Sequence, residues 1–212
     1  MLDPSVFAWM SKNPAPVLTW YTSEGRLEFT GPVMVRWIAK TANYVVEMFG
    51  EEAAVALGLP ASWRTLVWAT GAAFAGASVS VSDNSDLSVA DLFVTADEDA
   101  ASRAASEDPG LVVLLQDLGM MSFGWAGDLP SGVEDAIFEV NIQPDSLVVD
   151  VVPASLPIGE EVPAPAQAEG TEVIVGSPYM GRVWQAWSEG RAVVWIEEGL
   201  DVDRILSQEQ LV

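Results

Sequence analysis

Short apolar runs without charge alternate with longer segments of helical periodicity, and this alternation most limits what the chain can fold into. The runs 53–59 and 111–116 carry no charged residue, which favours strands buried on both faces, as in a parallel sheet. Between them, 63–75 is mostly apolar and reaches helical length before Gly76. We therefore predict βαβ units and an α/β fold, in which a mostly parallel sheet is covered by helices on both faces in three layers.

The same alternation extends along the 212 residues. The segments 17–22 and 26–29 flank the turn Ser23-Glu24-Gly25 and predict an amino-terminal β-hairpin. Other β-rich segments are 77–81, 91–95, 146–152, 171–176 and 191–197, and other predicted helices are 2–12, 30–50, 97–106, 133–142, 178–189 and 201–208. This length predicts a single domain over 1–212, with the Pro/Ala/Glu-rich stretch 153–170 as an exposed loop or linker. We expect the piece after that loop to return to the same sheet.

Two residue types are missing from the sequence, and their absence excludes several kinds of chemistry. The chain has no His and no Cys, which excludes a Ser-His-Asp triad, a thiol nucleophile, a disulfide and a zinc site built on His or Cys. Neither Lys12 nor Lys40 lies in a recognisable nucleotide or Schiff-base motif. We therefore predict no catalytic residue, no cofactor and no metal, and favour a protein that is not an enzyme.

The sequence is strongly acidic, with 31 Asp and Glu against 9 Lys and Arg and a formal net charge of -22. Because binding to phosphates needs clustered cations and those of this chain are scattered, we predict no nucleic-acid partner. An acidic surface also repels an anionic membrane, and no apolar run reaches the ~20 residues that cross a bilayer. With no targeting segment recognisable in residues 1–16, we predict a soluble cytoplasmic protein.

Several polar clusters are candidate sites, and each has a simpler structural interpretation that we favour. The turn at 175–182 could hold a small anion through helix-start amides and Arg182, or be a plain capped helix. Three acidic groups could bind a hard cation but lack the EF-hand spacing, which favours helix starts and loops: Asp97-Glu98-Asp99, Asp83-Asn84-Ser85-Asp86 and Asp201-Val202-Asp203. Paired carboxylates for acid–base chemistry could come from Asp117, Asp128, Glu134 and Asp135, although a solvated face explains them too.

Nine tryptophans are many for a chain of this length. Trp63 and Trp68 share one predicted helix, Trp184 and Trp187 share another, and Trp195 lies on the strand that follows. We favour core packing, and the alternative is a self-association surface or an acyl-binding pocket.

Within 17–82, a hairpin, a helix, an apolar strand, an apolar helix and a second strand follow one another. Three short motifs lie in this order, Thr41-Ala42-Asn43, Val55-Ala56-Leu57-Gly58-Leu59-Pro60 and Ala75-Gly76-Ala77. This pattern resembles the amino-terminal part of adenylate-forming (AMP-binding) enzymes, such as acyl-CoA synthetases. More narrowly, the chain resembles small actinobacterial proteins distantly related to those enzymes. The resemblance implies a subdomain of the adenylate-forming fold.

The sequence departs from that family where the chemistry lies. The family's phosphate loop is rich in Ser, Thr and Gly and ends in Pro-Lys-Gly, whereas 153–170 has Glu160, Glu161 and no lysine. Carboxylates repel a triphosphate. The family's ribose-binding Asp motif and its carboxy-terminal domain with a catalytic Lys also have no counterpart in these residues. The comparison implies a non-catalytic relative that binds an unknown protein partner or an apolar ligand. The alternatives are an enzyme completed by another chain and a structural homodimer formed by self-association.

Overall fold

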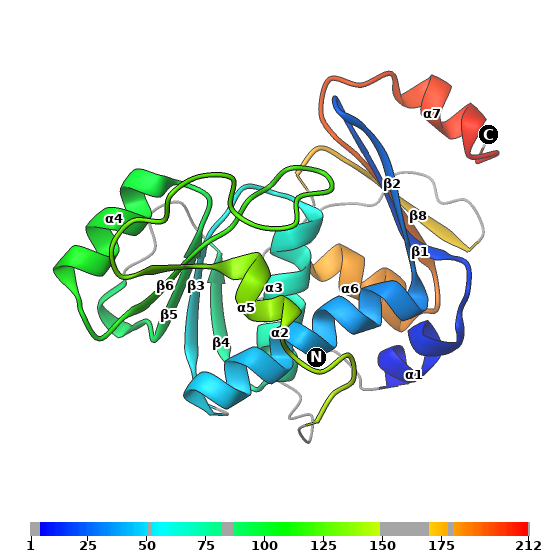
Figure 1. The fold of residues 1–212 in the computed structure, drawn as a ribbon. Coiled ribbons are helices and arrows are strands. Elements are labelled where there is room, and N and C mark those ends of the chain that lie inside the picture. Colours follow the sequence, from blue (N-terminus) through cyan, green and yellow to red (C-terminus); the bar gives the residue numbers. More distant parts are fainter. Residues whose placement is uncertain (1–4, 51, 82–86, 149–169, 178–179, 212) are drawn as a thin grey trace. The chain divides into compact units, whose positions relative to one another are not determined.

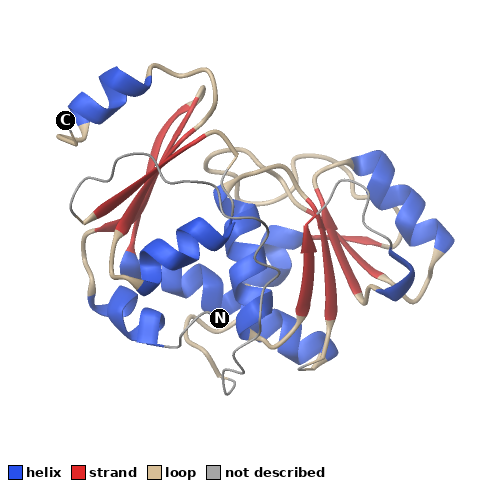
Figure 2. Ribbon diagram, turned by 180° about the vertical axis from the view of Figure 1, so that it is seen from behind, coloured by secondary structure: helices blue, strands red, loops and turns tan. Residues whose placement is uncertain are grey.

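A computed structural model describes residues 5–50, 52–81, 87–148, 170–177 and 180–211 of the chain. These residues divide into two compact units, one within 36–157 and the other within 2–35 and 158–212. Each has its own sheet (Figure 2), so we call them the five-stranded unit and the four-stranded unit. The single domain over 1–212 stays a prediction. The loop predicted at 153–170 lies, except for Gly170, outside the described residues.

The five-stranded unit contains a sheet whose strands are all parallel, in the order β4-β3-β5-β6-β7. Its elements are most of α2 (Gly31–Phe49), β3 (Ala54–Gly58), α3 (Trp63–Phe74), β4 (Ser78–Val81), the 3-10 helix η1 (Leu87–Val89), β5 (Leu92–Thr95), α4 (Glu98–Glu107), β6 (Val112–Leu115), β7 (Val133–Asp135) and α5 (Ala136–Asn141). Helix α4 covers one face of the sheet and α3 the other (Figure 1).

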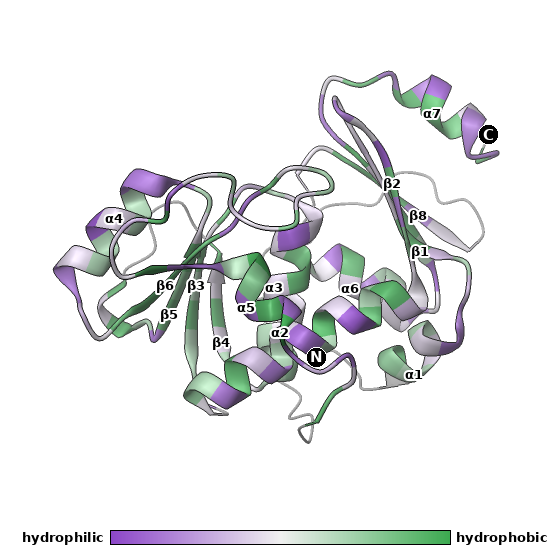
Figure 3. Cartoon of the chain, in the orientation of Figure 1, coloured by the Kyte–Doolittle hydropathy of each residue, from purple (hydrophilic) through white to green (hydrophobic). Residues whose placement is uncertain are grey.

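Both faces of this sheet are apolar because the strands alternate their side chains between two helical layers. Phe93 and Val113 point to the α4 face, where they pack in a cluster with Ala101 and Ala104 of α4. Leu92, Val94 and Leu114 alternate with them and are fully buried as well. The strands β5 and β6 are accordingly hydrophobic over most of their length (Figure 3).

Helix α3 is buried along its whole length. A side-chain cap at its first turn and a glycine in its middle make this burial possible. The Ser62 side chain caps the helix by accepting a hydrogen bond from the backbone N–H of Thr65. A Cβ added to Gly71 would lie 2.6 Å from Cβ of Thr41 and 3.0 Å from the carbonyl oxygen of Ile38. Gly71 therefore lets α3 pack closely against the Thr41-Ala42-Asn43 stretch of α2.

The four-stranded unit joins the two ends of the chain in one sheet of order β2-β1-β9-β8. Its elements are α1 (Ser5–Lys12), β1 (Pro16–Thr22), β2 (Gly25–Thr30), β8 (Thr171–Val175), α6 (Met180–Ser188), β9 (Ala192–Ile196) and α7 (Val202–Gln208). The hairpin β1–β2 is antiparallel, and β9 lies parallel to both β1 and β8.

Tryptophan anchors the α6 side of this sheet, and smaller residues pack on the other side. The indole N–H of Trp187 donates to the Val17 carbonyl at 3.0 Å, and that of Trp195 donates to the Gly176 carbonyl at 2.7 Å. On the opposite face, Ile205 of α7 packs in a cluster with Val194 and Ile196 of β9. Both faces of the four-stranded sheet are therefore covered by helices.

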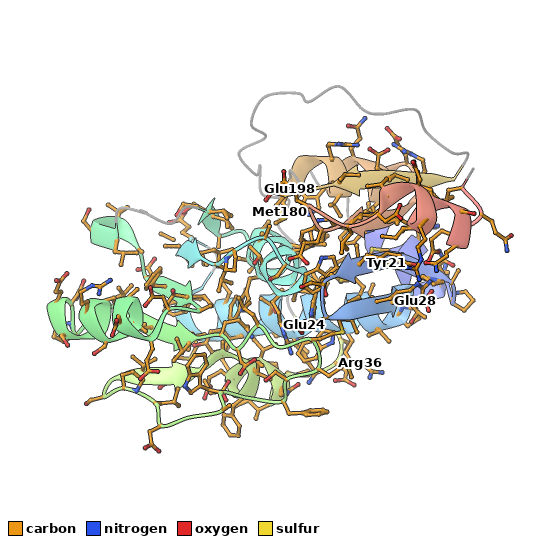
Figure 4. All side chains as sticks on the ribbon, turned by 90° about the horizontal axis from the view of Figure 1, so that it is seen from above. Tyr21, Glu24, Glu28, Arg36, Met180 and Glu198 are labelled. Atoms are coloured by element: carbon orange, nitrogen blue, oxygen red, sulfur yellow. The ribbon has the colours of Figure 1, made fainter. Side chains whose placement is uncertain are left out.

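An ion-pair network joins the hairpin of the four-stranded unit to the end of α7. Arg26 pairs with Glu28 at 2.7 Å and with Glu209 at 2.9 Å, and the Tyr21 hydroxyl donates to Glu209. Figure 4 labels Tyr21 and Glu28 on this hairpin. The hydrogen bond from Arg26 holds the pKa of Glu28 below its usual range. Burial, followed by the bond to Glu209, raises the pKa of Tyr21.

The α/β class, the mostly parallel pairing and the amino-terminal hairpin are confirmed, and three details of the prediction are corrected. The strands form two sheets instead of one, because β8 and β9 pair with the hairpin. The helix predicted at 133–142 begins with strand β7, because the Asp135 side chain caps the N–H groups of Ile137 and Phe138 and the helix starts there. No strand covers 146–148, the described part of the β-rich segment 146–152.

None of the helices among the described residues is both long enough and apolar enough to cross a membrane.

Candidate functional site

The carboxyl edge of the five-stranded sheet is the candidate site. The chain runs from β3 to β4 on one side, and β5 then lies on the other side of β3. The loops that follow β3 and β5 therefore diverge, and open α/β sheets bind ligands at such a switch point. Here the Thr95 hydroxyl donates to the Gly58 carbonyl at 3.2 Å and accepts from the N–H of Asp97 at 3.1 Å. Thr95 thus ties the two strand ends together.

Arg64, at the start of α3, is a buried cation beside this edge. It is 5% exposed, and its Nη2 donates to the Ser122 carbonyl at 2.9 Å. The guanidinium lies 4.0 Å from the ring centroid of Trp63 and 5.0 Å from that of Trp37. Its Nε has no hydrogen-bond partner among the described residues. Burial lowers the pKa of Arg64 to about 10, against the opposing pull of Asp117 and Asp135.

Next to Arg64, a buried amide closes the end of β6. Gln116 is 2% exposed, and its Oε1 accepts from the indole N–H of Trp68 at 2.9 Å. Its Nε2 donates to the Asp117 carbonyl at 2.8 Å. The cavity between these groups measures about 10 Å³, which is room for about one water molecule. Its lining is Trp37, Thr41, Arg64, Val67, Trp68, Gln116, Ala136, Ile137 and Val140.

The structure brings together part of the carboxylate set that the sequence predicts. Asp117 accepts from the N–H of Gly119 at 2.7 Å, and Asp135 from that of Trp125 at 2.7 Å, so both order the loop after β6. Both also act electrostatically on Arg64. Burial is the main cause that raises the pKa of Glu139, and the negative charges of Glu134 and Asp135 raise it further. Asp128 is exposed elsewhere on the loop. Asp117 and Asp135 therefore fix the conformation of the loop, and Glu134 and Asp135 place negative charge next to α5.

Lys40 and Asn43 lie on α2 and bind the segment that follows α5, and we call these two residues the clamp. Lys40 donates to the carbonyls of Asn141, at 2.8 Å, and Gln143, and pairs with Asp145 at 3.0 Å. It therefore places a cation at the carboxyl end of α5, where a helix dipole favours one.

Asn43 satisfies three backbone groups of the same segment. Its amide donates to the Pro144 carbonyl at 3.1 Å and the Ser146 carbonyl at 2.8 Å, and its oxygen accepts from the N–H of Val148 at 3.1 Å. A groove of about 470 Å³ lies beside this clamp, lined by Asn43, Val46, Glu47, Ile142, Gln143, Pro144 and Val148.

Replacing Asn43 with leucine is expected to lower the free energy of unfolding by about 2 kcal/mol, because it leaves three backbone groups without their buried partner. Urea denaturation measures the loss, and hydrogen exchange should show faster exchange of the Val148 amide. Asn13→Ala is the control, because it removes an exposed bond to the N–H of Ala15 and should change stability by less than about 0.5 kcal/mol. Equal effects of the two substitutions would contradict the clamp.

In the four-stranded unit, the predicted anion turn gives a different result. Arg182 pairs with Glu172 of the neighbouring strand at 2.5 Å and also donates to the Val173 carbonyl at 3.2 Å. The anion that Arg182 holds is thus a carboxylate of the chain itself. Pro178 and Tyr179, in the middle of that turn, lie outside the described residues.

The acidic groups considered as cation sites are helix starts where the structure describes them. Asp97 caps α4 by accepting from the N–H of Ala100, and Asp201 caps α7 by accepting from that of Arg204. The group 83–86 lies outside the described residues. Across the described parts of the chain, no three acidic side chains converge as a metal site requires.

All five tryptophans considered for an interface are core residues. Trp63, Trp68, Trp187 and Trp195 are at most 3% exposed, and Trp184 is buried too. This corrects the alternative of a self-association surface built on these five side chains.

Sequence reasoning missed Arg64, Gln116 and the clamp by Lys40. A signal existed for Arg64, since a single cation inside a mostly apolar helix has to find buried partners. Lys40 lies on the apolar face of its predicted helix, which is the same kind of signal. Nothing local to the sequence indicates that Gln116 meets Trp68, because the two are 48 positions apart.

The two sheets, their mostly parallel pairing and the helices on their faces define an α/β protein. Its fold is similar to the crystal structure of an acyl-CoA synthetase from Brucella canis, with a TM-score of 0.62 and 14% sequence identity. The similarity covers 98% of this chain and 48% of that one, so the chain spans about half the length of the synthetase. No protein-family model matches the sequence, and neither does any curated protein. The predicted likeness to acyl-CoA synthetases is therefore confirmed for the fold, while the actinobacterial group stays a prediction.

Proposed function

We propose that the chain is a non-catalytic relative of adenylate-forming, acyl-CoA synthetase-like enzymes that acts as a binding or protein-interaction module. The observation that carries this proposal is the filled carboxyl edge of the five-stranded sheet. Arg64, Gln116 and Trp68 occupy it and bond to the chain itself. The cavity that these side chains line, within the described residues, has room for about one water molecule, whereas a nucleotide needs several hundred cubic ångströms.

The charges of the chain support the same proposal. Phosphate binding needs backbone amides, hydroxyls and unpaired cations. At the described edge the nearest cation is Arg64, which is buried with Asp117 and Asp135 close enough to act on it. The stretch 153–170, where the family's phosphate loop is expected, holds two adjacent glutamates and no lysine. A triphosphate would therefore meet negative charge both from Asp117 and Asp135 and from the glutamates of 153–170.

Isothermal titration of the full chain with ATP and magnesium chloride tests the proposal. We expect no magnesium-dependent binding at millimolar ATP, because the cavity in the described part of the edge has room for about one water molecule and the cation beside it, Arg64, is buried. ADP and inorganic pyrophosphate, titrated in parallel, should give the same result. Micromolar binding of ATP that requires magnesium would end the proposal.

The second candidate function is an enzyme whose active site is completed by another chain. The coverage favours it, since the chain corresponds to about half of the Brucella canis acyl-CoA synthetase. ATP–pyrophosphate exchange, measured with a range of carboxylic acids in extracts of source cells with and without the gene, tests it. Exchange that depends on the gene supports a completed enzyme, and equal exchange in both extracts counts against it.

A further inference from the structure

Among the exposed large apolar side chains of the five-stranded unit, four lie on the loop after β6 and at α5 and are more than half exposed. Met121 is 67%, Phe123 87%, Phe138 58% and Ile142 61% exposed. Single exposed apolar residues need no explanation, but a group of them marks an interaction surface. We call these four residues the apolar face.

One carboxylate ties the backbone of the loop that carries Phe123 to the start of α5. Asp135 accepts from the N–H of Trp125, two residues after Phe123, at 2.7 Å, and from the N–H of Phe138 at 3.3 Å. Phe138 and Ile142 are four residues apart at α5, and the Ile142 N–H donates to the Phe138 carbonyl at 3.2 Å, which puts both side chains on one side of the helix. Ile142 also lines the groove of about 470 Å³. The loop, the helix and the groove thus adjoin one another.

The segment that carries the apolar face is acidic. Residues 104–148 contain eight Asp or Glu and no Lys or Arg. Glu134 and Glu139 lie on β7 and α5, and Glu47 lines the groove. The cationic side chains of α2 and α3 near this segment either form ion pairs or are buried. Arg36 and Lys40 both pair with Asp145, at 3.3 and 3.0 Å, and Arg64 is buried.

We propose that the apolar face, with the acidic residues around it, docks a cationic amphipathic helix of a partner protein. Such a helix lays its apolar side into a groove, and its Lys and Arg side chains meet the acidic rim. The proposal deepens the interaction role proposed above and rests on it. A second copy of the chain is a poor occupant because each copy carries a charge of -22. Anionic lipids and nucleic acids are repelled for the same reason.

The probe is a fluorescein-labelled helical peptide of sixteen Leu and Lys residues with an apolar and a cationic side. Fluorescence anisotropy with the full-length chain should show saturable binding that weakens as salt rises. The double variant Phe123→Ser/Phe138→Ser should bind about 30-fold more weakly, since buried aromatic anchors carry most of an interface's affinity. Val89→Ser is the matched control, because Val89 is 75% exposed on η1, outside the apolar face. It should bind like the unchanged chain.

Three results would overturn the proposal. The first is equal binding of the peptide by the double variant and the unchanged chain, because the attraction would then be charge alone. The second is equal binding of a peptide with Glu in place of Lys. The third is a dimer in light scattering that the double variant dissociates, because the occupant would then be a second copy. Circular dichroism confirms that each variant is folded. None of these readouts involves ATP, so this proposal and the absence of nucleotide binding fail separately.

Discussion

Replacing Glu172 with alanine is expected to lower the free energy of unfolding by about 3–5 kcal/mol, because removing one partner of a buried ion pair leaves an uncompensated charge. The Glu172 side chain is 4% exposed and pairs with Arg182 at 2.5 Å and with Arg191 at 2.6 Å. Without the carboxylate, Arg182 keeps its bond to the Val173 carbonyl. Chemical denaturation followed by circular dichroism measures the loss.

Glu189 provides the matched control for this prediction. It pairs with the same Arg191, at 2.5 Å, but its side chain is 47% exposed. Exposed pairs contribute about 0–1 kcal/mol, so Glu189→Ala should have a small effect. Glu172→Gln should fall between the two alanine variants, since an amide keeps the shape of the carboxylate and loses its charge. If Glu172→Ala lowered the free energy of unfolding no more than Glu189→Ala does, the stabilising role of the buried Glu172 carboxylate would be contradicted.

Glu172 also has a place in the architecture of its sheet. It lies on β8, an edge strand of the four-stranded sheet. Inward-pointing charges on edge strands disfavour pairing with other chains. The same carboxylate therefore holds α6 through Arg182. It also makes pairing of another chain with this edge unfavourable.

Most elements of this fold could be predicted because their signals are local. The charge-free run that became β3 and the apolar segment that became α3 are recognisable from composition and period alone. The helix starts at Ser62, Asp97 and Asp201 could be placed because side-chain caps act within three residues. The sequence pattern starts the helix three residues before α5 begins, because Val133–Asp135 pairs with β6, and this pairing depends on tertiary structure.

The pairing of the strands could not be predicted in the same way. Leu18 of β1 lies opposite Val193 of β9, and a pattern of apolar residues does not specify a neighbour so distant in sequence. The candidate site was hidden for the same reason. Asn43 bonds to Ser146, and Arg64 to Ser122, across long separations. Sequence reasoning found the residue types and could not find which groups they meet.

Trp68 links the core of the five-stranded unit to its filled edge, and Trp68→Ala is expected to lower the free energy of unfolding by about 3–5 kcal/mol. The side chain is 2% exposed and packs edge-on against Tyr44 with ring centroids 6.1 Å apart. Its indole N–H is the partner of Gln116. The substitution removes a large buried volume and a buried hydrogen bond together. Urea denaturation followed by circular dichroism measures the effect without relying on tryptophan fluorescence.

Two further variants separate the packing of Trp68 from its hydrogen bond. Trp68→Phe keeps an aromatic ring but leaves the Gln116 oxygen without its donor, which should cost about 1–3 kcal/mol beyond the lost volume. Adding Gln116→Leu removes the orphaned amide, so the double variant should recover part of that loss. If the losses of the two single variants simply add, the Trp68–Gln116 bond contributes nothing to closing the edge. Recovery in the double variant would show that the bond, and with it the filled edge, stabilises the five-stranded unit.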